Sequence, residues 1–68
     1  MTIKEYPEEQ LNKYFDEQDR LVRIDFLKSG NICYITYVGD TTQKSTVVWS
    51  NGYTYIHNPD GTVTEVRT

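Results

Sequence analysis

The stretch WSNGYTYIHNPDG, residues 49–61, decides the fold, because it places two turn signals on either side of one alternating strand. Asn51-Gly52 between apolar runs is the strongest short-range hairpin signal, since both central residues of a type I′ turn need positive φ. Asn58-Pro59-Asp60-Gly61 is typical of a type I turn closed by a glycine in the left-handed region. The stretch therefore predicts three antiparallel strands, over residues 44–50, 53–58 and 62–67.

Two further strands are predicted before this stretch. Residues 21–28 and 31–38 alternate apolar and polar side chains, as a half-buried strand does. Ser29-Gly30 between them is typical of a tight turn. We expect residues 20–67 to form a five-stranded antiparallel meander.

The residues before this sheet have a helical pattern instead. Pro7 suits the first position of a helix, acidic residues follow it in the first turn, and Leu11, Tyr14, Phe15 and Gln18 share one stripe. We predict a helix over residues 7–18, preceded by an arm over residues 1–6. The predicted fold is a single α+β domain, residues 1–68, with the helix packed on a curved sheet. A small, partly open barrel is the alternative for that sheet.

The predicted turns also assign side chains to the two faces of the sheet. Two-residue turns would place Phe26 opposite Cys33 and Trp49 opposite Thr54. The last turn would pair Thr54 with Val66, and Ile56 with Thr64. The helix would cover this inner face. The outer face would then collect aromatic and charged side chains: Tyr34, Tyr53, Tyr55, His57, Arg23 and Arg67.

Composition limits the classes of function. The chain has 68 residues, a net charge of −3 and one cysteine, so no disulfide framework is expected and the cytoplasm is the natural location. No apolar segment is long enough to cross a membrane or to act as a signal sequence. Lys and Arg do not cluster, which disfavours direct nucleic-acid binding. The excess acidity lies in residues 1–20.

No set of residues with catalytic spacing is present. His57 is the single histidine, with Glu65 diagonal to it in the predicted hairpin, but no nucleophile is placed beside the pair. Cys33 is expected to point inward and to behave as a small hydrophobic residue. One Cys and one His cannot supply the four ligands of a structural zinc site within one chain. We expect neither an enzyme nor a bound metal or cofactor.

The Tyr-bearing outer face is the predicted binding site. Tyr and Arg are enriched at the energetic centres of protein interfaces. The hypothesis is a small protein-binding module that acts as an inhibitor, adaptor or regulatory protein, a class that includes host-directed proteins of phages and mobile elements. Binding of single-stranded nucleic acid or a nucleotide on the same aromatic face is one alternative. Self-association through that face, as a homodimer, is the other.

Overall fold

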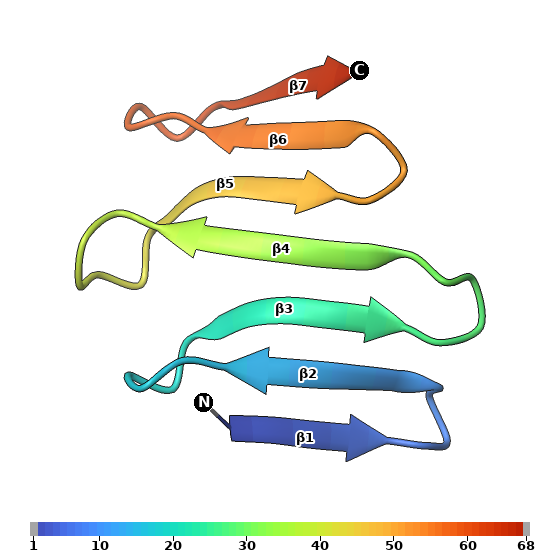
Figure 1. Ribbon diagram of the computed structural model, residues 1–68. Coiled ribbons are helices and arrows are strands. Elements are labelled where there is room, and N and C mark those ends of the chain that lie inside the picture. The colour runs from blue at the N-terminus through green and yellow to red at the C-terminus, as the bar shows by residue number, and fades with distance from the viewer. Residues whose placement is uncertain (1, 68) are drawn as a thin grey trace.

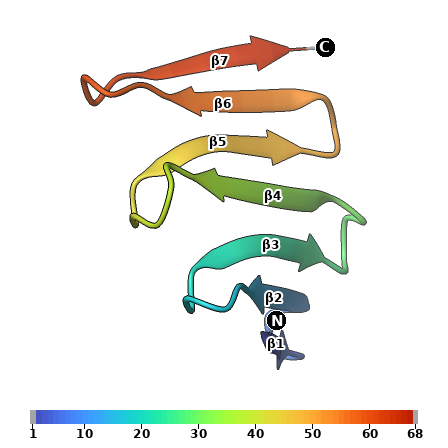
Figure 2. The same ribbon diagram turned by 60° about the vertical axis from the view of Figure 1, so that its left-hand side comes forward.

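Short strands joined by tight turns account for nearly the whole chain in the computed structural model, which describes residues 2–67 (Figure 1). The seven strands are β1 (Thr2–Tyr6), β2 (Leu11–Phe15), β3 (Leu21–Phe26), β4 (Ile32–Tyr37), β5 (Lys44–Trp49), β6 (Tyr53–His57) and β7 (Val63–Arg67). They form one antiparallel sheet in sequence order, from β1 at one edge to β7 at the other. Each strand contacts only its sequence neighbours among these residues, so the sheet is open (Figure 2).

The predicted helix over residues 7–18 is wrong, and with it the α+β fold class. Residues 7–10 form a turn between β1 and β2, closed by a bond from Gln10 N to the carbonyl oxygen of Pro7 (3.3 Å), with Gln10 at φ +57°. The predicted arm over residues 1–6 falls largely on β1, while residue 1 lies outside the described residues. The stripe at Leu11, Tyr14 and Phe15 fits a helix locally, but pairing with β1 and β3 along both sides overrides that preference.

The sheet therefore has seven strands rather than five, and the partly open barrel is also wrong because β1 and β7 do not meet. The described chain forms a single layer, with principal extents of 36 × 29 × 15 Å. Two packed sheets would lie about 10 Å apart and make a thicker body. Cys33 and Ile35 are the only buried hydrophobic side chains found within residues 2–67, at 3% and 6% exposure.

The turns set the registers, and one of them differs from the prediction. The last turn agrees with it: Gly61 has φ +90°, its N–H bonds to the carbonyl oxygen of Asn58 (3.1 Å), and Thr54 pairs with Val66. At the preceding turn Val48, not Trp49, pairs with Thr54. Asn51-Gly52 forms the end of a three-residue loop that begins at Ser50, and only Gly52 (φ +101°) has positive φ there. This is the geometry of a type I turn with a bulge, not of a type I′ turn.

This one-residue difference reverses the faces of β6 and β7 relative to β3, β4 and β5, because neighbouring residues in a strand point to opposite sides. The turn between β3 and β4 is also longer than predicted, and Ile24 rather than Phe26 pairs with Cys33. The register between β3 and β4 is thus shifted by two residues from the predicted one. Because side chains alternate with a period of two, this shift leaves the faces of β3 and β4 as predicted. The predicted inner face is therefore correct from β3 to β5 and wrong for β6 and β7.

We call one side the apolar face. Its central members come from β3, β4 and β5: Val22, Ile24, Phe26, Cys33, Ile35, Val47 and Trp49. The Phe26 and Trp49 rings stack there with centroids 5.5 Å apart. The other side, the opposite face, carries Arg23, Asp25, Tyr34 and Thr36 at the same level of the sheet. No segment among residues 2–67 forms a second layer over either face.

Candidate functional site: the two faces of an open sheet

One row of side chains crosses the opposite face from edge to edge. Consecutive strand pairings connect one residue of each strand, in the order Ile3, Tyr14, Arg23, Tyr34, Val48, Thr54 and Val66. Four of these side chains are exposed although they are large and hydrophobic: Ile3 at 54%, Tyr34 at 43%, Val48 at 39% and Val66 at 41%. A solvated sheet face is normally polar. This cross-strand row is therefore unusual for a surface that stays in water.

Arg23 lies in the row between Tyr14 and Tyr34. Its guanidinium carbon is 4.8 Å from the ring centroid of Tyr14 and 5.5 Å from that of Tyr34, so the cation lies between aromatic rings of the two adjacent strands. Its Nε atom donates to Asp25 Oδ1 at 2.7 Å, and the hydroxyl of Tyr14 donates to Asp25 Oδ2 at 2.9 Å. We call these four residues the Arg23 cluster.

The ionisation of the cluster follows from these contacts. The hydrogen bond to Asp25 raises the pKa of the Tyr14 phenol, because the bonded proton is harder to remove, and desolvation adds to this. The same carboxylate raises the pKa of the Arg23 guanidinium through its hydrogen bond. At neutral pH the cluster therefore holds a protonated phenol and a charged guanidinium in fixed positions.

A groove of about 370 Å³ runs beside the Arg23 cluster. Its lining comes from three strands: Tyr14, Val22, Arg23, Tyr34, Ile35 and Thr36. The combination of two aromatic rings, one cation and a hydroxyl offers apolar contact and a few directed hydrogen bonds.

The six residues predicted to share one face lie on two. Tyr34 and Arg23 belong to the cross-strand row, whereas Tyr53, Tyr55, His57 and Arg67 lie on the same side as the apolar face, because Tyr55 pairs with Val47. The guanidinium of Arg67 stacks over the ring of Tyr53 at 5.0 Å, and Tyr55 Oη is 3.5 Å from Glu65 Oε1. Tyr53 and Tyr55 border a depression of about 230 Å³ with Trp49.

His57 is separated from these rings. It pairs with Val63 and borders a polar cavity of about 480 Å³ between the β4–β5 and β6–β7 turns. Within the described part of the chain no group of three potential metal ligands is found. Burial raises the pKa of the Cys33 thiol, which lowers its reactivity at neutral pH.

Tyr14 is the member of the Arg23 cluster that the sequence analysis leaves out of the sheet, and Asp25, although its spacing predicts it on the same face as Arg23, is not predicted as a binding residue. The predicted helix over residues 7–18 includes Tyr14 and so excludes it from the predicted sheet. A sequence signal does exist, since Asp25 follows Arg23 at the two-residue spacing that puts both on one face of a strand. Recognising the cluster requires knowing that the residues before position 16 also form a strand.

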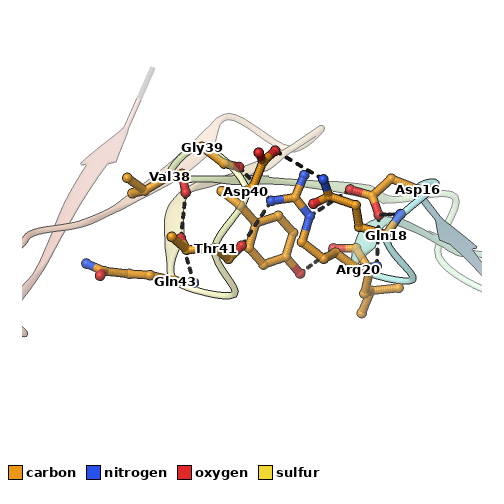
Figure 3. Close-up of polar contacts among 10 residues, drawn as sticks. Asp16, Gln18, Arg20, Val38, Gly39, Asp40, Thr41 and Gln43 are labelled. Atoms are coloured by element: carbon orange, nitrogen blue, oxygen red, sulfur yellow. Dashed lines mark hydrogen bonds and ion pairs between the residues drawn. The ribbon is translucent and has the colours of Figure 1, made fainter.

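A second network holds the turns at one end of the sheet and is drawn in Figure 3. Arg20 Nη1 donates to the carbonyl oxygens of Gly39 (2.7 Å) and Thr41 (2.9 Å), and its Nε donates to Asp16 Oδ2 (2.8 Å). The guanidinium also stacks over Tyr37 at 4.9 Å. This Arg20 bridge joins the β2–β3 turn to the β4–β5 turn and thereby restrains the ends of the central strands.

Comparisons of the chain with protein-family models, with curated proteins and with solved structures find no match. Residues 2–67 contain no helix that is long and apolar enough to cross a membrane. The function is therefore inferred from the residues and geometry of the two faces.

Proposed function

We propose that this chain is a protein-binding module whose contact surface is the cross-strand row, with the Arg23 cluster as its energetic centre. The observation that carries the proposal is the position of the Arg23 guanidinium between Tyr14 and Tyr34, with its Nε bonded to Asp25 at 2.7 Å. Tyr and Arg dominate the centres of protein interfaces. The role is that of an inhibitor, adaptor or regulatory protein in the cytoplasm.

The internal contacts of the cluster reduce the cost of binding. Ordering a long side chain at an interface costs roughly 0.5–1.5 kcal/mol of conformational free energy. Arg23 is already held by two rings and a carboxylate, so most of its freedom is lost before a partner arrives. Tyr34 adds a large, rigid, exposed ring beside it.

The rest of the row supplies apolar area on both sides of the centre. Val48 and Val66 lie toward β7, and Ile3 lies at the β1 edge. With strands about 4.8 Å apart, seven strands give a row of roughly 29 Å. That length suits a protein partner that presents an apolar ridge across the strands.

Nucleic-acid binding has less support on this face. The charge of Arg23 is offset by Asp25, and the chain carries a net charge of −3. Single-strand binding proteins combine stacking rings with a basic groove that follows the phosphates. The cross-strand row contains aromatic rings, but the groove beside it carries a single cationic side chain, Arg23, and is not a basic channel.

The test compares two equivalent truncations, Tyr34→Ser on the opposite face and Tyr53→Ser on the side of the apolar face. The partner is first identified by crosslinking in the source cell, then purified and titrated by calorimetry. Losing an interface anchor costs about 2 kcal/mol, so Tyr34→Ser should weaken the Kd by about 30-fold. Tyr53→Ser should change it by less than about threefold, and circular dichroism verifies that both variants fold.

Equal binding by wild type and Tyr34→Ser would overturn the proposal. A Tyr53→Ser variant with the larger loss would move the site to the other side of the sheet. Tight, salt-sensitive binding of an oligothymidylate that disappears in Tyr34→Ser would favour the nucleic-acid alternative.

A further inference from the structure

We propose that a second copy of this chain covers the apolar face, so that two sheets pack face to face in a β-sandwich dimer. The apolar face consists of side chains that normally form a core, and Cys33 and Ile35 at its centre are already buried by their lateral neighbours. Around them Val47 and Trp49 remain only half-buried. No segment among residues 2–67 lies over them.

The exposed surface of the chain supports a missing layer. A folded monomer of 8.0 kDa is expected to expose about 4,450 Å². This chain exposes 4924 Å². The excess arises because a single-layer sheet presents both of its sides to water, and packing the apolar face against another sheet would remove it.

The sheet is large enough for a stable dimer. Its extents of 36 × 29 Å describe a plane of about 1,000 Å², whereas a standard interface buries about 800 Å² on each partner. Sheets in such sandwiches pack about 10 Å apart with nearly aligned strands. A partner of the same size and shape therefore covers the whole face.

The distribution of polar groups on this face matches an interface. The centre, formed by Ile24, Cys33, Ile35 and Trp49, holds no charge. The charged side chains lie toward the edges: Lys4 and Lys13 on β1 and β2, and Glu65 and Arg67 on β7. An apolar centre with a polar rim is the common organisation of protein interfaces.

The dimer would leave both Arg23 clusters on its outer sides, so this inference is independent of the proposed function. Each dimer would then present two copies of the cross-strand row. Loss of partner binding in Tyr34→Ser without a change in mass would separate the two surfaces experimentally.

The mass of the full chain is measured by light scattering coupled to size exclusion, from 1 to 200 µM. We expect twice the 8.0 kDa chain mass at high concentration, falling toward 8.0 kDa on dilution. Trp49 fluorescence should shift to longer wavelength as the dimer dissociates, because the ring becomes more solvated. A mass of 8.0 kDa throughout would overturn the proposal and leave another protein as the occupant of this face.

Substitutions to lysine on the two sides of the sheet test which face the second copy covers. Val47→Lys at the centre should abolish the dimer. The matched control is Ile56→Lys on the opposite face, which should leave the dimer mass unchanged, with folding of each variant checked by circular dichroism.

Discussion

Replacing Gly61 by alanine isolates the contribution of one backbone conformation. Gly61 has φ +90° and closes the β6–β7 turn, where Asn58 N also bonds to the carbonyl oxygen of Thr62 at 2.8 Å. A Cβ atom added at Gly61 would meet no heavy atom within 4 Å. The substitution therefore introduces no collision, and its cost comes from holding an L-residue in the left-handed region.

That cost is about 1–2 kcal/mol for alanine. The reduced freedom of the unfolded chain offsets part of it, by about 0.4–1 kcal/mol. The net loss should be about 1 kcal/mol, equivalent to a decrease in Tm of about 4–8 °C for a domain of this size.

Thermal unfolding followed by circular dichroism at one fixed protein concentration measures the change. The matched control is Gly61→Asn, because asparagine tolerates the left-handed region better than alanine does, so its Tm should lie between those of wild type and Gly61→Ala. An unchanged Tm in Gly61→Ala, or equal losses in both variants, would refute the conformational explanation.

Three further predictions concern the turns and the buried thiol. Arg20→Lys should lower Tm by several degrees, because lysine has one nitrogen in place of the separate guanidinium nitrogens that bond the Asp16 carboxylate and the two loop carbonyls; an unchanged Tm would show that the Arg20 bridge does not stabilise the fold. Hydrogen bonds to Asp16 and Asp60 lower the pKa of both carboxyls, so their contribution to stability is present above about pH 4 and is lost as the pH falls through the lowered values. The loss of Tm between pH 5 and 2 should be smaller when both are replaced by asparagine, and an identical pH profile would contradict this. Cys33, whose pKa is raised by burial, should react with a thiol reagent at pH 7.5 at least tenfold more slowly than it does in the urea-unfolded chain; equal rates would mean that the apolar face opens readily.

The sequence predicted correctly those parts of the fold that neighbouring residues specify, and it failed where contacts between distant residues decide. The strands from position 21 onward followed from two-residue periodicity, and the Asn58–Gly61 turn with its register was correct because four adjacent residues specify it. Asn51-Gly52 allowed two turn geometries that differ by one residue, and the wrong one reversed the faces of β6 and β7. The sequence therefore predicts Tyr53 and Tyr55 on the face of Tyr34, whereas they lie on the other side of the sheet.

The sequence by itself determined that the chain forms an antiparallel sheet, because alternation and turn residues act over a few neighbouring positions. Only the tertiary structure decided that residues 2–15 form β1 and β2, since Leu11, Tyr14 and Phe15 satisfy either period and hydrogen bonding to β3 selects the strand. It likewise decided the Arg23 cluster, which combines side chains from three strands. Whether a face of the sheet is covered depends on contacts between distant residues, which no local sequence pattern encodes. For this reason the predicted covering helix is wrong, and residues 2–67 form an open single layer.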